Sequence, residues 1–436
     1  MRILLVEPWE SGSHLAWATG YQASSRHEVH IVGLPGELWR WRLRGGALPL
    51  ADKISNWIER NGQPDLLLVS GLVDVAELVG LTRRSLAPDV GVVIYQHESQ
   101  LVYPVANGNF DQGAALRNWM SWCAADLVLF NSYHHLRAVG DALPGFVTNL
   151  PDKTHLPMLD HVLSRFEVFP VGVDLTHVTD LDPVRPAETT RRPRRRPKRS
   201  DSTRSRERNG SSSSGDETPL DQFATSALSA ARRSGPPVIL WPHRWERDKD
   251  PGAFLAGLDK VVAAGLEFRL VLAGQDPPGG SAQAVAERDE AERRFGSWTL
   301  VSGELERDEY LAALARCDLV VSCARHEFFG VAVVEAVASG CVPLLPNALS
   351  YPELIRPPWH QHVLYEPGTF GSRLVDAVAR IDELQSATLG LAQSMRRFDW
   401  STMARVYDER FEAVHERLDK VATPAAELAR SNPALA

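Results

Sequence analysis

The sequence predicts an α/β protein made of two Rossmann-like domains, each built on a parallel sheet. Short continuous apolar runs alternate with spacers of helix length, and this alternation occurs twice, once on each side of a polar segment. Continuous apolar runs are typical of strands buried on both faces, and their alternation with helices is typical of parallel sheets. A chain of 436 residues, 44% of them hydrophobic, is also long enough for two or three domains with separate cores.

The first domain is placed at residues 1–178. Its first apolar run, at residues 3–6, is too short for the apolar region of a signal peptide and is predicted to be a buried strand. No uncharged apolar run approaches the roughly 18 residues of a membrane-spanning helix, so we expect no membrane insertion and a cytoplasmic protein. Further strands of this domain are predicted at residues 29–32, 66–69, 92–95 and 127–130.

A Pro-, Arg-, Ser- and Gly-rich segment at residues 179–235 follows the first domain. Residues 185–208 carry 11 Lys/Arg and 3 Asp/Glu; because the whole chain has a net charge of −8, the remainder carries −16. This composition is too polar to bury a core and predicts a disordered basic insert between the domains. Arg194, Arg195 and Arg196 could bind RNA phosphates, and the alternative is a solvated linker kept extended by its own charge.

The second domain is placed at residues 236–398, and residues 399–436 are predicted to form a C-terminal helix and a tail. We expect the helix to pack back on the first domain, because it has one apolar face. That face is formed by Met403, Val406, Tyr407, Phe411 and Val414. The strands of the second domain are predicted at residues 238–241, 270–273, 298–301, 319–322 and 342–345.

Two cations, Arg244 and Lys249, lie between the first predicted strand of the second domain and a helix that begins near Pro251. Ligands of doubly wound α/β sheets bind at the carboxyl ends of the strands. A pair of cations on such a loop can neutralise a diphosphate, and the alternative is a solvated charged loop.

A second motif, which contains Glu327, Gly330 and Glu335, follows the strand predicted to end at residue 322. Gly330 is predicted to open a helix, and the N–H groups and dipole of a helix N-terminus favour a phosphate. One carboxylate on either side could then hold hydroxyl groups. A solvent-facing Glu335 is the alternative, but the valines around it make an idle charge costly.

The first domain supplies further candidates. Gly12 follows the first strand and would let the backbone approach a phosphate closely, while His97 follows the fourth strand and would face the cleft between the domains; a structural histidine is the alternative. Trp39, Arg40, Trp41 and Arg42 combine aromatic and basic groups suited to stacking on RNA bases, although tryptophans are more often core residues.

The R-x4-K pair and the E-x7-E spacing together resemble family 4 of the retaining glycosyltransferases, which have the GT-B fold of two Rossmann-like domains facing across a cleft. The resemblance implies a nucleotide-sugar donor. It also implies that Arg244 and Lys249 neutralise the donor diphosphate, together with Gly12 and Gly330 of the predicted phosphate loops. By the same resemblance Glu335 binds the nucleotide ribose, and Glu327, which holds sugar hydroxyls, and His97, which contacts the donor sugar, are the catalytic candidates.

Five segments, at residues 8–14, 38–42, 97–104, 241–251 and 326–335, are similar to the glycosyltransferases that mannosylate queuosine in tRNA. This resemblance implies transfer of mannose from GDP-mannose to the cyclopentene-diol of queuosine at the wobble position of tRNA(Asp), with retention of anomeric configuration. The chain departs from the pattern at Ser99, where that family has Asn, and in the Arg-rich insert. The alternatives are a lipid or small-molecule acceptor and, outside the enzymes, a catalytically silent RNA-binding module.

No metal and no cofactor besides the nucleotide sugar is expected, because Arg244 and Lys249 can supply the positive charge that a divalent cation would supply. Asp248 and Asp250 match the D-x-D metal motif of another glycosyltransferase fold, but they overlap the cationic loop, so we interpret the match as chance. The cysteines lack zinc-site spacing, which predicts buried thiols without a disulfide or a structural metal. They are Cys123, Cys317, Cys323 and Cys341.

Overall fold

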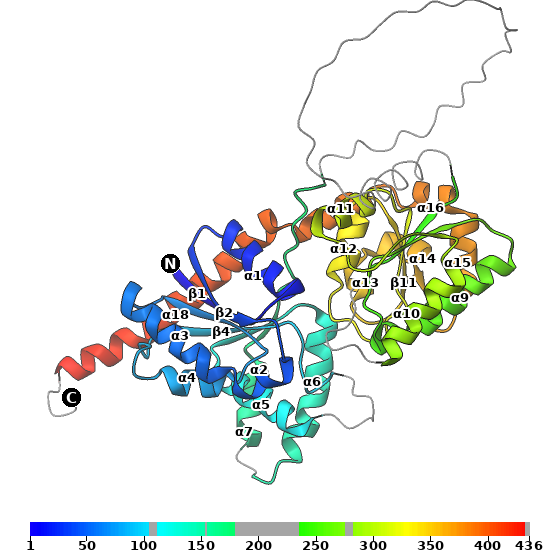
Figure 1. Cartoon of the computed structure of the whole chain (residues 1–436). Helices are drawn as coiled ribbons and strands as arrows, with labels where there is room; N and C mark the ends of the chain where they lie inside the picture. Colours follow the sequence, from blue (N-terminus) through cyan, green and yellow to red (C-terminus); the bar gives the residue numbers. More distant parts are fainter. Residues whose placement is uncertain (104–110, 153–154, 179–234, 275–281, 432–436) are drawn as a thin grey trace, which may run out of the picture.

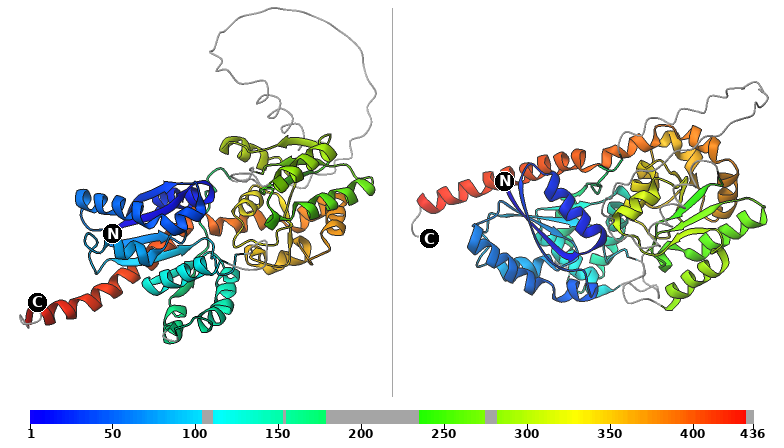
Figure 2. Two further views of the ribbon diagram at one scale, coloured as in Figure 1. Left: turned by 60° about the horizontal axis from the view of Figure 1, so that its bottom comes forward. Right: turned by 45° about the horizontal axis from the view of Figure 1, so that its top comes forward.

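The computed structural model describes residues 1–103, 111–152, 155–178, 235–274 and 282–431. It contains two α/β lobes that face each other, and a long C-terminal helix runs from the second lobe along the first (Figures 1 and 2). Each lobe is built on one six-stranded sheet, and every strand pairing in both sheets is parallel. The predicted basic insert at residues 179–235 lies, except for its last residue, outside the described part of the chain.

The first lobe has the strand order β2-β1-β3-β4-β5-β6. Successive side chains of a strand point to opposite faces, so Ile3 and Leu5 enter the core shared with the first and last helices while Leu4 and Val6 enter the core on the other face. Its strands are β1 (Arg2–Glu10), β2 (Glu28–Pro35), β3 (Leu66–Ser70), β4 (Gly91–Gln96), β5 (Leu127–Phe130) and β6 (Phe166–Val168). Its helices are α1 (Gly12–Ser24), α2 (Trp39–Gly45), α3 (Ala47–Asn61), α4 (Val75–Thr82), α5 (Gln112–Ala124), α6 (Tyr133–Thr148) and α7 (Leu156–Leu163).

The second lobe has the strand order β12-β11-β10-β7-β8-β9. Its strands are β7 (Val238–Trp241), β8 (Arg269–Leu272), β9 (Thr299–Ser302), β10 (Leu319–Val321), β11 (Val342–Pro346) and β12 (Leu364–Tyr365). Its α-helices are α9 (Pro251–Ala263), α10 (Ala282–Phe295), α11 (Arg307–Leu314), α12 (Val331–Ala338), α13 (Tyr351–Leu354), α14 (His360–Val363), α15 (Phe370–Ala379), α16 (Ile381–Ala387) and α17 (Leu391–Ser394). The short 3-10 helices are η2 (Arg247–Lys249), η3 (Pro357–Trp359) and η4 (Met395–Phe398).

Every predicted strand is present, and β6 and β12 are additional. Four of the continuous apolar runs are buried on both faces as predicted: every residue of β3, β4, β5 and β7 is buried. The run predicted at residues 298–301 forms the edge strand β9 and is only half-buried. The strand β12 has only two residues, which is too short for a pattern to predict.

The last helix, α18 (Trp400–Ser431), joins the lobes. Its buried Asp408 accepts hydrogen bonds from the Tyr21 hydroxyl (2.8 Å) and from the backbone N–H of Arg26 (2.9 Å). A Cβ atom at Gly20 would overlap the indole of Trp400, so this glycine lets the helix approach α1 closely. The prediction that Val406 belongs to the apolar face is wrong: Val406 is 43% exposed, whereas the other four predicted residues are buried.

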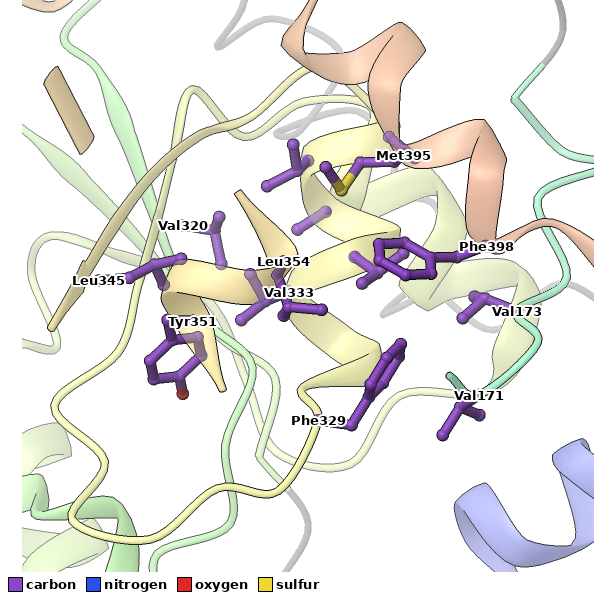
Figure 3. Packing of buried hydrophobic residues seen from close by; sticks show 14 of the residues in the cluster. Val171, Val173, Val320, Phe329, Val333, Leu345, Tyr351, Leu354, Met395 and Phe398 are labelled. Carbon is purple, nitrogen blue, oxygen red and sulfur yellow. The ribbon is translucent and has the colours of Figure 1, made fainter. Parts of the chain in front are cut away.

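The helix α12, which carries the second sequence motif, is fixed by apolar packing. Figure 3 shows Val333 of α12 beside Val320 of β10 and Leu354 of α13, with Phe329 lying near Phe398. The rings of Phe329 and Phe398 are 5.3 Å apart in an edge-on arrangement. The loop that precedes α12 is therefore held by packing against this apolar core. No helix in the described ranges is long and apolar enough to span a membrane.

Candidate active site

Lys249 and Glu327, from loops that follow β7 and β10, form an ion pair. Lys249 Nζ lies 3.2 Å from Glu327 Oε2, 3.2 Å from Asp248 Oδ2 and 3.2 Å from the carbonyl oxygen of His326. Burial lowers the pKa of Lys249, but the two carboxylates outweigh it and raise the pKa overall. Burial raises the pKa of Glu327, and Lys249 outweighs that effect and lowers it. Both side chains are therefore charged near neutral pH, in a largely buried place.

Arg244, on the same loop as Lys249, is less tightly engaged. Its guanidinium lies 2.9 Å from Glu246 Oε2, and 45% of its side chain stays exposed. Across the cleft lies Glu98: burial raises the pKa of its carboxyl, and the positive charges of His14 and Arg244 oppose that rise. Arg244 thus faces the first lobe with donor groups still open to an anion.

Gly330 lies at the start of α12 as predicted, in the N-cap position directly before Val331. Its φ of 104° lies in the left-handed region that favours glycine, and a Cβ there would lie 3.2 Å from Leu354 Cδ1. No side chain caps this helix, so its first N–H groups are open to an anion. Glu327 Oε1 accepts a hydrogen bond from the Phe329 N–H (3.4 Å), which places the carboxylate at the entrance to the same helix.

Glu335, the second carboxylate of the motif, is buried and paired with Arg307. Arg307 Nη1 lies 2.6 Å from Glu335 Oε1. Burial raises the pKa of Glu335 and Arg307 opposes the rise. Arg307 was not predicted from the sequence, although a buried carboxylate requires a partner. The ion pair leaves the second carboxylate oxygen of Glu335 for another donor.

His97 lies directly after β4 among aromatic rings. Its ring centroid is 4.1 Å from that of His14, 4.8 Å from Tyr95 and 4.8 Å from Trp17, and Asn131 Nδ2 donates to its carbonyl oxygen (2.9 Å). Burial, with the nearby His14, holds the pKa of His97 well below its usual value, so the ring is neutral near pH 7. Its buried Nε2 has no hydrogen-bond partner in the described chain, which makes it a candidate for a substrate hydroxyl.

The structure adds a pair that the sequence analysis did not single out, Glu7 and His14. The fully buried Glu7 places Oε1 3.1 Å from His14 Nδ1, and the Trp9 N–H donates to the same oxygen (2.9 Å). Burial lowers the pKa of His14, but Glu7 more than compensates and raises it. The sequence does hold one indication of this pair: Glu7 directly follows the apolar residues 3–6 of a predicted buried strand. A buried carboxylate without a partner is costly, so a partner for Glu7 could have been expected.

Among the described residues, one group of His, Cys and acidic side chains has atoms close enough together to hold a metal ion. This group consists of Glu7, His14 and His97. Their ligand atoms lie within 4.8 Å of one another. The aspartates of the D-x-D match are engaged otherwise: Asp248 pairs with Lys249, and Asp250 caps α9 and lies 2.7 Å from Arg325.

The remaining predicted residues are distributed as follows. Gly12 is the first residue of α1, with a φ of 51° and open space where a Cβ would lie. Trp39, Arg40, Trp41 and Arg42 form the start of α2 on the surface of the first lobe. The residues Arg194, Arg195 and Arg196 lie outside the described part of the chain, and all four cysteines are free thiols.

The loop that precedes α12 contacts the first lobe. The Tyr103 ring is 4.9 Å from that of His326, and His135 stacks on Phe328 at 3.7 Å. Ser99, which departs from the expected Asn, is buried and accepts a hydrogen bond from the Leu101 N–H (3.3 Å). The side chain at position 99 therefore supports the turn after His97.

Comparisons with known proteins agree with this architecture. Residues 2–173 match the family model described as tRNA-queuosine alpha-mannosyltransferase N-terminal, and residues 226–393 match glycosyl transferases group 1. Among solved structures, HepE from Anabaena in complex with UDP aligns with a TM-score of 0.59 and 16% identity, covering 95% of this chain and 100% of that one. Sucrose-phosphate synthase from Thermosynechococcus elongatus aligns with a TM-score of 0.61 and 15% identity, with the same coverage. These likenesses show the GT-B fold.

A curated relative extends the match over both lobes. The tRNA-queuosine alpha-mannosyltransferase of Drosophila melanogaster is 30% identical over 358 residues, which is 81% of this chain and 81% of that protein. Together with the family model of the first lobe, this identity settles the family, and the chain belongs to the tRNA-queuosine alpha-mannosyltransferases.

Proposed function

We propose that this protein transfers mannose from GDP-mannose to the cyclopentene-diol of queuosine at the wobble position of tRNA(Asp), with retention of anomeric configuration. The observation that carries the proposal is the match of the first lobe, residues 2–173, to a model specific for tRNA-queuosine mannosyltransferases. In our assignment this lobe is the acceptor side. A tRNA substrate would place the reaction in the cytoplasm.

The second lobe supports the donor half of the proposal. Lys249 and Arg244 would bind the diphosphate together with the open N-termini at Gly330 and Gly12. A fixed set of cations and N–H groups stabilises the charge that develops on a departing diphosphate, and it needs no rearrangement at the moment of reaction. Glu327 would hold sugar hydroxyls, and Glu335 would bind the ribose through the oxygen not paired with Arg307.

The first lobe would complete the reaction centre. The neutral His97 would form a hydrogen bond to a hydroxyl group of the mannose through its unpartnered Nε2. The acceptor hydroxyl oxygen forms a bond to the anomeric carbon on the face from which the bond to the diphosphate oxygen breaks. The hydroxyl proton passes to a departing phosphate oxygen, so GDP leaves with that proton and no enzymic nucleophile is needed.

The proposal is tested by incubating the purified full chain with GDP-mannose, UDP-glucose or UDP-galactose and with bulk queuosine-containing tRNA, followed by nucleoside mass spectrometry. We expect a hexose on queuosine with GDP-mannose alone, and NMR of the product should show an α-mannoside. A product only with a UDP-sugar would overturn the donor assignment. Hydrolysis of GDP-mannose without any modified nucleoside would overturn the acceptor and point to a lipid or small molecule, and absence of both would point to a silent RNA-binding module.

A further inference from the structure

Two tryptophans of α2 lie on the surface of the first lobe. All 12 tryptophans of the chain are in described residues, and Trp39 and Trp41, at 38% and 59% exposed, are the ones in the exposed class. Two indoles left in water on a helix of seven residues do not contribute the stabilising free energy that burial of their apolar surface would give. Such a surface indicates a partner that covers it.

The Trp41 ring has one covered face. A Cβ atom at Gly45, one helical turn away, would lie 2.8 Å from Cζ2 of that ring. The glycine therefore lets the indole lie flat along the helix, while more than half of the side chain remains open. A ring held flat on one side with its other side free is a platform for stacking a planar group.

The same helix is basic, although the protein as a whole is acidic. α2 contains Arg40, Arg42 and Arg44 and no acidic residue, whereas the chain has a net charge of −8. The Arg40 guanidinium lies 5.0 Å from the centre of the Trp39 ring. Arg44 pairs at the surface with Asp111 (2.9 Å), a contact that solvent weakens. Aromatic platforms with nearby arginines are typical of single-stranded nucleic acid sites.

This surface, which we define as Trp39, Arg40, Trp41 and Arg44, borders the reaction centre. The chain that leads into α2 touches the chain that leads into α1: a Cβ at Gly36 would overlap Ser11, and a Cβ at Gly33, near the end of β2, would overlap Glu10, the last residue of β1. Ser11 is followed by Gly12 and, within the first turn of α1, by His14 of the candidate site. A substrate that spans several nucleotides can therefore reach both places.

We propose that this surface binds an anticodon-loop nucleotide next to the modified one, with the base stacked on the free face of Trp41 and with Arg40 and Arg44 on the flanking phosphates. The inference rests on the proposed tRNA acceptor. RNA is favoured over an anionic membrane because the surface is one short helix beside the site, where a neighbouring nucleotide of the same acceptor must pass.

The test measures the affinity of the full chain for queuosine-containing tRNA at several salt concentrations, alongside its affinity for GDP-mannose. Trp41→Ala should weaken tRNA binding about tenfold or more, Trp41→Tyr should retain most of it, and Gly45→Ala, which displaces the ring, should weaken it without removing any aromatic group. Arg40→Gln should lower the salt slope by about 0.7 to 0.9. The matched control Arg293→Gln, on the exposed face of α10, should change nothing.

Affinity for GDP-mannose should stay unchanged in each variant, which separates this surface from the donor site and from misfolding. The inference is overturned if Trp41→Ala binds tRNA like the wild-type protein, or if the variant loses affinity for phosphatidylserine vesicles but not for tRNA. A wild-type protein that binds GDP-mannose but no tRNA would overturn the proposed acceptor as well, so the two failures are distinguishable.

Discussion

The carboxylate of Glu7 lies 3.1 Å from Nδ1 of His14, at the point where β1 meets the start of α1. A hydrogen bond from Nδ1 to a carboxylate fixes the tautomer and the orientation of an imidazole. The other ring nitrogen of His14 is then directed away from Glu7. Because the His14 ring packs against the His97 ring, with the ring centroids 4.1 Å apart, Glu7 positions a group at the centre of the candidate site.

Glu7→Gln should lower the pKa of His14, because the substitution removes the charge that raises it. A raised pKa in the folded state means that protonated His14 stabilises the fold below about pH 6.5, the usual value for histidine. That contribution is lost as the pH rises through the raised pKa. The variant should therefore lose about 1 to 3 kcal/mol of unfolding free energy near pH 6 and less at pH 9. NMR titration of His14 and denaturation at both pH values check this, with Glu10→Gln as the control. An unchanged His14 titration would contradict it.

Lys249→Ala should lower the rate of mannose transfer by about two to three orders of magnitude, since it removes a fixed charge from the proposed diphosphate site. Glu327→Gln should also lower the rate. The two effects should not add in the double variant, because the side chains form one ion pair at 3.2 Å. Steady-state kinetics measure all three, and Lys260→Ala on α9 is the control. Additive losses would show that the pair does not act as a unit.

Glu335→Gln should weaken GDP binding, and the loss should depend on the ribose hydroxyls. The wild-type protein should prefer GDP to 2′,3′-dideoxy-GDP, and the variant should bind the two nearly equally. Isothermal titration calorimetry with both nucleotides distinguishes ribose binding from a structural role. If the variant loses affinity equally for both, then Glu335 serves only to hold Arg307.

Activity should survive exhaustive treatment with EDTA, because Arg244 and Lys249 would carry the role of a divalent cation. The treated enzyme is assayed with GDP-mannose and tRNA prepared without Mg²⁺. If activity disappears and returns with Zn²⁺ or Mn²⁺, a metal is required. The cluster of Glu7, His14 and His97 would then be the first place to look, by repeating the titration on His14→Ala.

The strands and the motif loops could be predicted from the sequence, because burial on both faces of a parallel sheet requires continuous apolar runs. Lys249 and Glu327 were predicted to lie on loops that follow strands; that these strands, β7 and β10, are neighbours is shown only by the structure. Arg307 could not be found this way: it is the first residue of α11 and follows the edge strand β9, which is not a neighbour of β10, the strand before the loop of Glu327.

Helical periodicity in the sequence predicts the apolar face of α18, but it does not predict which residues at the edge of that face are buried. Val406 is 43% exposed although its side chain is apolar, so residue type alone does not mark where the stripe ends. The pairing of Glu7 with His14 depends on how a strand end meets a helix start, and a pattern of residue types does not record that geometry. The position of the Trp41 ring likewise depends on Gly45, four residues further on, because a Cβ atom there would lie 2.8 Å from the ring.

The most direct test of the account uses two preparations of tRNA(Asp) that differ only at the wobble position, one with queuosine and one with guanosine. Each is incubated with the full chain and GDP-mannose, and the nucleosides are separated and weighed by mass spectrometry. We predict mannosylated queuosine from the first tRNA and no modified nucleoside from the second. Transfer to neither tRNA by a protein that still hydrolyses GDP-mannose, or equal transfer to both, would contradict the account.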